Sequence, residues 1–257
     1  VRPAMSAGVL RPCIVIPNYD HGSSIRRLVS ALSAHGLPIY IVDDGSHEHT
    51  RAELERVAAD FAQVRLHRFA ANAGKGSAMK HALLWARADG MTHALQIDAD
   101  GQHDAADVPR FLARAAARPQ ALIVGDPQFD ASAPKARLYG RKLTNFWVCI
   151  ETLSMAVKDS QCGFRLYPLA AACALIEEAE LPRRMSFDIA IVVRLAWRGT
   201  LVENLPTRVV YPPGGLSHFN MLADNARITL LHTLLVLGML VRLPVLLGRR
   251  FGSRPAP

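Results

Sequence analysis

The sequence has few cysteines and none of the close pairs that bind zinc or build a disulfide framework. Its four cysteines are Cys13, Cys149, Cys162 and Cys173, and no two of them form a Cys-x-x-Cys pair. This spacing excludes both kinds of stabilised scaffold and fits a reducing, cytosolic setting. The chain also lacks internal repeats, low-complexity segments and nucleic-acid-binding motifs, so we expect no nucleic acid among its partners.

The first residues lack a long apolar run, so we expect no signal peptide. Basic residues are in excess, with a formal net charge of +8 over 257 residues. This excess favours a phosphate-rich partner such as a nucleotide or an anionic membrane, although it also serves solubility. The length suits one domain with a tail. We expect a loose leader over residues 1–11, a folded domain over 12–222 and an apolar tail with basic flanks over 223–257.

Short apolar runs alternate with helical patterns through the first half of the chain. This alternation predicts an α/β fold, with a mostly parallel central sheet flanked by helices. Ligands of such sheets bind beyond the carboxyl ends of the strands. Polar clusters at 17–20, 43–46 and 98–103 follow three of the predicted strands, so we expect the site there. The predicted strands are residues 13–17, 39–42, 64–69, 93–97 and 121–124.

The pattern is less regular after residue 130. It predicts a helix over 137–156, a strand over 163–167 and a helix over 187–197. Residues 204–211 include a proline, which limits strand pairing, so we expect an extended segment at a sheet edge.

The segment 228–247 is strongly apolar and long enough to span a bilayer. His232, Arg242 and Pro244 interrupt it, and arginines follow at once. An amphipathic helix lying in the membrane interface fits this pattern best. A membrane-spanning helix and a buried helix of a soluble domain remain alternatives.

Two carboxylates two residues apart follow the fourth predicted strand. In an extended segment Asp98 and Asp100 point the same way and can face one ion, with Gln102 nearby. Hard oxygen ligands suit Mg²⁺ or Mn²⁺, and substrate phosphates would complete the coordination shell. The alternative is an exposed acidic turn that caps the next helix.

Two more carboxylates, Asp43 and Asp44, follow the second predicted strand. A carboxylate there can accept hydrogen bonds from a base or from ribose hydroxyls. Turn chemistry explains Gly45 and Ser46, so Asp43 is the better ligand candidate.

The segment 72–76 opens a predicted helix and carries Lys75 between two glycines. Free N–H groups and a lysine at a helix N-terminus can form an anion cradle. The longer glycine spacing of a Walker loop is missing, and a plain helix-entry turn is the alternative.

Polar residues of the second half include several cations. Arg137, Arg141 and Arg165 can neutralise a diphosphate leaving group or a phosphate acceptor, and Ser217 and His218 can donate to phosphate. The alternative is that these residues belong to surface loops.

Asp188 offers a further carboxylate, a base if the acceptor is a hydroxyl. A solvated or paired helix residue is the alternative.

Taken together, these segments resemble family 2 glycosyltransferases, in the branch of dolichyl-phosphate mannosyltransferase and related polyprenyl-phosphate enzymes. The resemblance covers residues 11–219, and its six motifs occur in order. The motifs are IVIPNY at 14–19, VDDGS at 42–46, GKG at 74–76, DADGQH at 98–103, DSQCGFR at 159–165 and GLSH at 215–218.

The resemblance implies that residues 12–222 form a GT-A catalytic domain that inverts the sugar's anomeric configuration and needs Mg²⁺ or Mn²⁺. It implies a UDP- or GDP-sugar donor. By this resemblance the metal residues are Asp98, Asp100 and Gln102. We expect Asp100, Asp188, Arg141 and Arg165 to take part in catalysis. The residues implied to hold the donor are Pro17, Tyr19, Asp43, Asp44, Lys75, Asp98, Ala99, Gln102, Arg137, Ser217 and His218.

The sequence departs from this family in three places. His218 stands where relatives often have a lysine, and Ala190 where they often have an acid. Relatives with a full membrane domain also continue much further. Because Ala190 stands in place of that acid, the acceptor class stays open.

We therefore expect a peripheral enzyme of the cytoplasmic membrane face, with a lipid-linked acceptor. A lipid phosphate needs no base, whereas a hydroxyl acceptor would use Asp188 or Asp159. A sugar nucleotidyltransferase and a non-catalytic membrane adaptor are further alternatives. A sugar nucleotidyltransferase would need a glycine-rich, arginine-bearing loop right after the first strand, and residues 18–21 of this chain are not such a loop. The intact Asp98 and Asp100 argue against a non-catalytic adaptor.

Overall fold

The apolar runs predicted as strands lie side by side in one seven-stranded sheet, as seen in a computed structural model of the protein. The structure describes residues 9–129, 133, 135–211 and 220–252. The strand order is β3-β2-β1-β4-β6-β5-β7. The strands are β1 (Pro12–Asn18), β2 (Ile39–Asp43), β3 (Val64–Arg68), β4 (His93–Gln96), β5 (Leu122–Phe129), β6 (Arg165–Pro168) and β7 (Val202–Val209).

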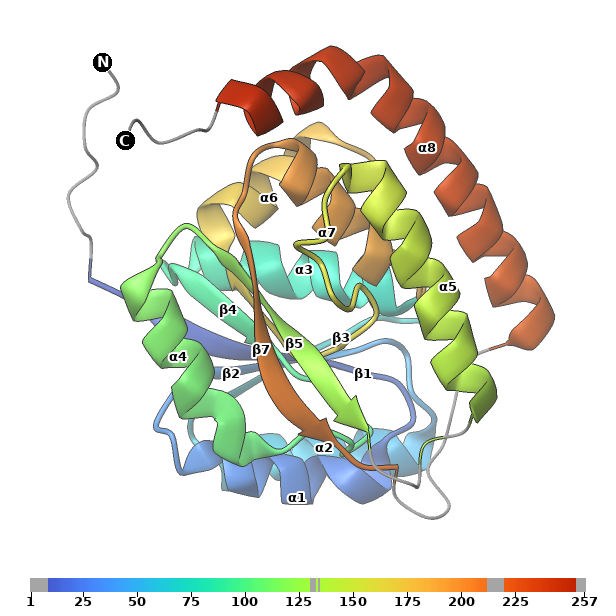
Figure 1. The fold of residues 1–257 in the computed structure, drawn as a ribbon. Coiled ribbons are helices and arrows are strands. Elements are labelled where there is room, and N and C mark those ends of the chain that lie inside the picture. Colours follow the sequence, from blue (N-terminus) through green and yellow to red (C-terminus); the bar gives the residue numbers. More distant parts are fainter. Residues whose placement is uncertain (1–8, 130–132, 134, 212–219, 253–257) are drawn as a thin grey trace.

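Helices cover both faces of this sheet, which confirms the predicted α/β class (Figure 1). One face carries α1 (Gly22–Ser33), α2 (Glu48–Asp60), the short 3₁₀ helix η1 (Ala105–Asp107) and α4 (Val108–Ala117). The other face carries α3 (Lys75–Ala88), α6 (Leu169–Glu178) and α7 (Phe187–Trp197). Outside α7, α5 (Lys135–Thr152) and α8 (Met221–Gly252) pack against each other.

The sheet is mostly parallel, with β6 as its exception. β6 runs antiparallel to both of its neighbours, so Arg165 pairs with Gln96 of β4 and with Val124 of β5. Because β6 runs in the opposite direction, it begins at the edge where β1, β2 and β4 end. The residues just before β6 therefore reach the same edge as the polar clusters after those three strands.

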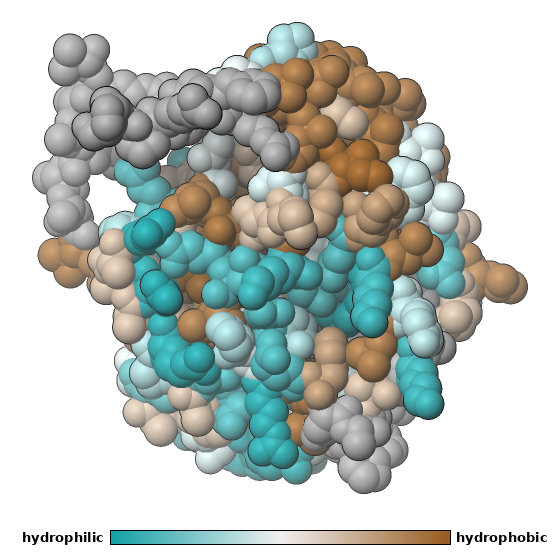
Figure 2. All heavy atoms as spheres, in the orientation of Figure 1, coloured by the Kyte–Doolittle hydropathy of each residue, from teal (hydrophilic) through white to brown (hydrophobic). Residues whose placement is uncertain are grey.

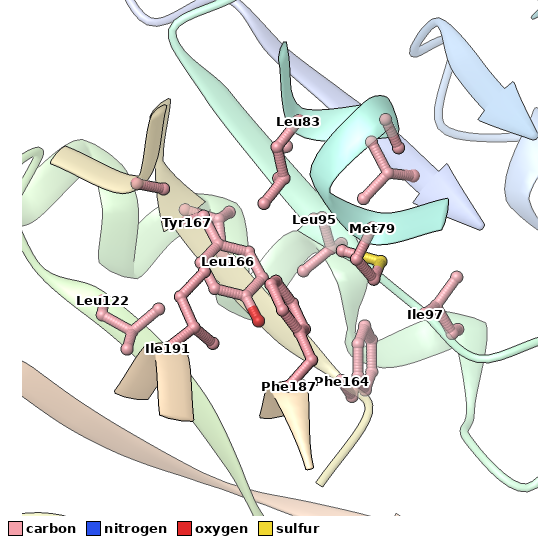
Figure 3. Packing of buried hydrophobic residues seen from close by; sticks show 14 of the residues in the cluster. Met79, Leu83, Leu95, Ile97, Leu122, Phe164, Leu166, Tyr167, Phe187 and Ile191 are labelled. Carbon is pink, nitrogen blue, oxygen red and sulfur yellow. The ribbon is translucent and has the colours of Figure 1, made fainter. Parts of the chain in front are cut away.

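The core between the sheet and the second helical layer is made of large apolar side chains (Figure 3). This cluster includes Met79 and Leu83 of α3, Tyr167 of β6, and Phe187 and Ile191 of α7, all of them fully buried. Each such side chain stabilises the fold by roughly 1.5–3 kcal/mol relative to exposure. This packing fixes the N-terminal ends of α3 and α7 above the polar edge of the sheet.

The observed elements depart from the predicted ones at a helix end, at an additional helix and at the sheet edge. The helix predicted to reach residue 156 ends at Thr152, because Leu153 adopts a left-handed conformation with φ of 50°. Helix α6 was not predicted. The predicted edge segment is the strand β7, which lies last in the strand order and pairs only with β5 in the described part of the chain; its Pro206 is tolerated there.

Helix α8 extends beyond both ends of the apolar segment 228–247. One side packs on the domain through Leu231, Leu235 and Met239, whereas Leu234 and Val241 on the other side are 55% and 81% exposed. Among the described helices, α8 is the one whose length and composition suffice to cross a membrane. In Figure 2 apolar side chains gather along the upper right of the molecule, where α8 runs in Figure 1. So much exposed apolar surface contradicts the alternative of a buried helix.

Candidate functional site

The polar clusters after β1, β2 and β4 meet at one edge of the sheet, as their positions predicted. Asn18 and Asp43 are paired in the register of β1 and β2. The N–H of Asp44 donates to the carbonyl oxygen of Asn18 over 2.8 Å, and Asp98 follows directly after β4 and Ile97. The carboxyl ends of three neighbouring parallel strands thus bring polar side chains together.

A cavity of about 1550 Å³ opens at this edge. Its far part runs between α5 and α8, where Leu143, Trp147, Ile228 and Val236 line it. The cavity therefore has a polar end over the strands and an apolar end between two helices. The predicted site residues that line it are Pro17, Tyr19, Asp44, Lys75, Asp98, Ala99, Asp100, Gln102, Arg137, Arg141 and Asp188.

Lys75 joins the two carboxylates at the centre of the polar end. Its Nζ lies 2.7 Å from Oδ2 of Asp98 and 2.7 Å from Oδ2 of Asp188. Burial opposes the charge of Lys75, but the two carboxylates outweigh it and raise the pKa of Lys75. Burial likewise opposes ionisation of Asp98, but the Lys75 ammonium holds the pKa of Asp98 below its usual range. Lys75 and Asp98 therefore keep each other charged.

Asp100 lies two residues after Asp98, and the pKa of its carboxyl group is raised above the usual value. Burial, and then the negative charge of Asp98, raises the pKa of Asp100 to about 6. Its Oδ1 accepts the N–H of Gln102 over 3.0 Å. A carboxylate whose pKa is raised by burial and by a neighbouring negative charge marks a place where an added cation is favourable.

A divalent ion would find oxygen ligands at this site, but no complete set of protein ligands among the residues that the structure describes. No three His, Cys, Asp or Glu side chains converge on one point in the described ranges, so the protein offers no complete cage. Asp98, Asp100 and the Gln102 amide offer a partial oxygen shell on the cavity wall. Mg²⁺ is commonly held this way, by one or two carboxylates plus substrate phosphates and water, so the residues fit.

Asp44, rather than Asp43, reaches the cavity, which reverses our preference between the two. Asp43 is fully buried; its Oδ2 accepts from Nε of Arg68 over 2.8 Å and its Oδ1 from the N–H of Ser46. Asp43 is absent from the cavity wall, whereas Asp44 is on it. Asp43 therefore holds the turn in place.

The predicted anion cradle at the start of α3 is filled by the protein itself. Oδ1 of Asp44 accepts the N–H of Ala73 over 2.7 Å, and Oδ2 accepts the N–H of Gly74 over 2.9 Å. Gly74 has φ of 98°, a left-handed conformation that glycine adopts without strain. Since Lys75 is also paired, the cradle is not open to a donor phosphate in this structure.

The predicted arginines occupy different places. Arg141 lines the cavity but donates from Nη1 to both oxygens of Asp159, over 2.7 and 2.8 Å. Arg137 lines the cavity above the ring of Tyr211, with 5.4 Å from Cζ to the ring centroid. These two can face an anion, although Arg141 shares its charge with Asp159.

Arg165 does not reach the cavity, which corrects its predicted catalytic role. Its side chain is fully buried and its guanidinium donates to the carbonyl oxygens of Ser160, Cys162 and Asp188. A buried arginine with its donors on backbone carbonyls is a structural bridge. It ties the segment before β6 to the first turn of α7, which carries Asp188.

Asp188 lies in the first turn of α7, beside Asp98. Besides Lys75 it contacts Gln96, whose Nε2 donates to Oδ1 over 3.4 Å. Asp159, the alternative base, is absent from the cavity wall. Ala190 is fully buried, so the departure from the family at that position lies away from the cavity. Of the carboxylates considered as a base, Asp188 is the one that faces the cavity.

Sequence reasoning missed Gly163, His103 and Arg184. A Cβ on Gly163 would lie 1.9 Å from Oδ2 of Asp98, so only glycine fits there. Burial lowers the pKa of His103 to about 4 and keeps it neutral. Arg184, which lines the cavity, packs its Cγ against Gly74. Of these residues, Gly163 and His103 lay inside recognised motifs. The predicted Ser217 and His218 fall outside the described residues.

Comparisons with known proteins agree with the resemblance carried by the motifs. A family model described as Glycosyl transferase family 2 matches residues 13–171. Dolichyl-phosphate beta-glucosyltransferase of Dictyostelium discoideum is 26% identical over 166 residues, which cover 60% of this chain and 49% of that protein. Polyprenol monophosphomannose synthase of Mycolicibacterium smegmatis is 26% identical over 204 residues, 76% of this chain and 74% of that protein. The chain thus spans about half the length of the Dictyostelium relative.

A solved structure has the same fold. Glucosyl-3-phosphoglycerate synthase of Mycobacterium tuberculosis, in complex with Mn²⁺, UDP-glucose and phosphoglyceric acid, aligns with a TM-score of 0.64 at 11% identity. The alignment covers 90% of this chain and 80% of that one. This likeness confirms the predicted GT-A fold.

Proposed function

Because the chain belongs to glycosyl transferase family 2, we propose that it transfers one sugar from a nucleoside diphosphate sugar to a lipid-linked acceptor. The observation that carries this proposal is the continuity of the cavity, which leads from Asp98 and Asp100 to the apolar groove between α5 and α8. A donor of this class carries an anionic diphosphate, and a polyprenyl phosphate carries a long apolar chain. The two ends of the cavity match these two chemistries.

The donor end has residues for a divalent ion. Asp98, Asp100 and Gln102 would hold Mg²⁺ or Mn²⁺, which when bound supplies positive charge to the departing diphosphate. The Mycobacterium tuberculosis enzyme has been solved with Mn²⁺ and UDP-glucose, which supports this choice. Lys75 keeps Asp98 ionised and therefore ready to bind a cation.

The remaining donor residues are proposed from their places on the cavity wall. Pro17 lies near the end of β1, Tyr19 just after it and Asp44 just after β2, and all three line the cavity wall where a nucleoside would bind. Arg137 and Arg141 stand on α5, on the opposite wall. Cations placed where negative charge develops on the departing diphosphate stabilise the transition state.

The acceptor class we favour is a lipid phosphate. Its oxygen is already nucleophilic, so it forms the new bond to the anomeric carbon without a base, while the bond from that carbon to the diphosphate breaks. The bonding electrons leave with the nucleoside diphosphate, and attack from the opposite side inverts the sugar. The alternative, a hydroxyl acceptor, needs Asp188 to accept a proton although Lys75 already occupies its Oδ2.

The apolar groove supports the lipid acceptor. Residues of α8 that line it recur every three or four positions, from Ile228 through His232 to Val236, and form one face of the helix. Trp147 and Leu143 line the facing side of α5. Leu237 of α8 lines the groove and is 55% exposed, so a lipid chain that leaves the groove there would enter a membrane on which α8 lies.

The groove and the basic charge together favour a peripheral position on the cytoplasmic membrane face. The exposed side of α8 is apolar over much of its length, and Arg242 and Arg249 lie near its C-terminal end. Arginines beside an apolar helix face favour the anionic lipids of the cytoplasmic leaflet.

A thermal-shift screen of UDP- and GDP-sugars, with and without Mn²⁺, tests the donor. We expect one donor to raise the melting temperature only with Mn²⁺, and the Asp98→Asn variant to lose this rise. Transfer to a polyprenyl phosphate in detergent tests the acceptor, and NMR of the product tests inversion. No shift with any donor would contradict the proposal.

A double variant separates the two acceptor classes. Asp188→Asn combined with Asp159→Asn removes both candidate bases. Full activity in this variant would exclude the hydroxyl mechanism, because no alternative carboxylate base would remain among those considered.

A further inference from the structure

A second, smaller cavity of about 250 Å³ lies where the C-terminal end of α7 meets α8. Three arginines line it: Arg194 in the last turn of α7, Arg198 just after it, and Arg242 on α8. Trp197 and Leu234 also line this cavity. We call these five residues the arginine pocket. It is separate from the cavity that holds Asp98 and Asp100.

The pocket is built on a rigid floor. Trp197 is 9% exposed, and its Nε1 donates to the carbonyl oxygen of Glu151 over 2.7 Å. Gly238 lets α8 approach closely, because a Cβ there would lie 2.8 Å from the Trp197 ring. The Arg242 guanidinium lies over the same ring, 4.8 Å from its centroid. This cation–π contact holds Arg242 at the pocket rather than in solvent.

Positive charge in the pocket exceeds the negative charge beside it. Arg198 pairs with the exposed Glu178 over 2.9 Å. Arg194 donates to the carbonyl oxygen of Glu180, and Arg242 to that of Gly238. Neither Arg194 nor Arg242 forms an ion pair with a carboxylate in the described ranges. Burial, and after it the charges of Arg242 and Arg198, lowers the pKa of Arg194, so the cations repel one another.

The pocket also borders the exposed apolar face of α8. Leu234 lines the pocket and is 55% exposed. Leu230, Leu237 and Val241 lie on the same side of the helix, within a turn or two of Leu234, and are exposed as well. Figure 2 shows apolar side chains gathered over the region of α8. An anion held by the arginines would thus lie at the boundary of an apolar surface.

We propose that the arginine pocket binds the phosphate group of an anionic membrane lipid, with the lipid's acyl chains lying along the exposed leucines of α8. Guanidinium groups bind phosphate oxygens through paired hydrogen bonds. A phosphate between Arg194, Arg198 and Arg242 would relieve their mutual repulsion. The adjoining leucines favour a lipid over a free phosphate ion. This inference rests on the proposed position of α8 on a membrane.

Binding to vesicles tests the proposal with the full chain. Vesicles of phosphatidylcholine alone are compared by cosedimentation with vesicles that also contain about 30% of the anionic lipid phosphatidylglycerol, whose negative surface attracts basic residues. We expect Arg194→Gln with Arg242→Gln to weaken binding to the anionic vesicles by about fivefold per arginine. Binding to phosphatidylcholine alone, which depends on the leucines, should stay unchanged.

The matched control removes the same charge elsewhere. Arg51 and Arg56 are exposed on α2, on the opposite face of the sheet from α7, and Arg51→Gln with Arg56→Gln should bind anionic vesicles within about twofold of the unaltered protein. Equal losses in the two double variants would overturn the proposal, since net charge alone would then explain binding. Unchanged binding in the pocket variant would overturn it as well.

Two further measurements keep this test separate from that of the proposed function. Sugar transfer in detergent should be unaltered in the pocket variant, so loss of vesicle binding with full transfer supports the pocket. Unaltered vesicle binding in that variant overturns the pocket and leaves the transferase proposal standing. If the double variant fails to fold, Arg198→Gln at the exposed rim replaces it, with about a fivefold loss expected.

Short-chain phosphatidylglycerol and inorganic phosphate distinguish the two sources of phosphate. We expect the lipid, below its micellar concentration, to raise the melting temperature of the unaltered protein and not that of the pocket variant. Equal protection by inorganic phosphate at the same concentration would overturn the assignment to a lipid.

Discussion

Glu151 on α5 and His232 on α8 are joined by a 2.6 Å hydrogen bond between Oε1 and Nδ1, and both side chains are buried. The other polar atom of each, Oε2 of Glu151 and Nε2 of His232, has no hydrogen-bond partner among the described residues. Burial raises the pKa of Glu151, and the hydrogen bond from His232 opposes this rise. The pair is a buried polar contact that joins α8 to α5.

Removing both partners of this pair should cost less than the two single removals added together. We expect Glu151→Leu or His232→Leu alone to lower the free energy of unfolding by about 1–3 kcal/mol, because a buried polar group loses its partner. The double variant should be less destabilised than the sum of the single variants. Urea-induced unfolding of all four proteins measures this. Strictly additive losses would show that the two side chains do not act as a pair.

Lys75→Met should lower transfer by about a hundredfold or more, comparable to losing one preorganised electrostatic contact in an active site. The variant leaves Asp98 and Asp188 without their shared cation, so the two carboxylates repel and move. Steady-state kinetics with the donor found by thermal shift measure the loss. Lys80→Met on the same helix is the control, since Nζ of Lys80 donates to the carbonyl oxygen of Leu181. Near-normal kcat/KM for Lys75→Met would refute the role of Lys75.

Gly163→Ala should displace the Asp98 carboxylate, because the added Cβ would lie 1.9 Å from Oδ2. A displacement of about 1 Å at a catalytic group can cost about a hundredfold in rate, and we expect a loss of that order. Weaker Mn²⁺ binding, measured by titration calorimetry, should accompany it. Gly248→Ala is the matched control: Gly248 has no atom within 4 Å of an added Cβ and lies in α8, where alanine favours the helix.

The stability of the protein should fall as the pH drops below about 6.5, in part because of His93. Burial, which outweighs a hydrogen bond to the carbonyl oxygen of Pro119, lowers the pKa of His93 from 6.5. Below the unfolded pKa the unfolded state binds more protons than the folded state, so acid favours unfolding. The contribution of His93 is thus complete above about pH 6.5 and is lost as the pH falls toward its folded pKa.

Unfolding free energies at several pH values between 7.5 and 5 measure this dependence. His93→Gln should show a shallower decline over that range, whereas a variant of the exposed His49 should follow the unaltered protein. Parallel declines in His93→Gln and the unaltered protein would contradict the assignment.

Hydrophobic periodicity predicted most of this fold, and its failures have physical causes. Helix α6 was missed because its residues, Leu169–Glu178, are apolar on nearly every side and so show no helical period. The antiparallel direction of β6 was not predictable, since four buried residues carry no signal of strand direction. Parallel strands such as β1 and β2 were evident because helical segments separate them.

The sequence predicted where the site lies, but it predicted the roles of only some of its residues. Carboxylates at strand ends located Asp98 and Asp100, because strand ends converge in a parallel sheet. The choice between Asp43 and Asp44 failed because adjacent residues point to opposite sides, and the pattern does not say which side is open. Arg165 was misjudged because arginine is rarely fully buried; three backbone carbonyls make its burial possible here.

The triad of Lys75, Asp98 and Asp188 has a consequence for how the protein folds. Lys75 and Asp188 are 113 positions apart in the chain, and Gly163, which packs on Asp98, arrives from a third distant segment. Contacts of such sequence separation form slowly, because the loop-closure entropy must be overcome before they stabilise anything. A nascent chain that ends before α7 therefore lacks this centre, and the binding site is completed late in folding, after the parallel half of the sheet.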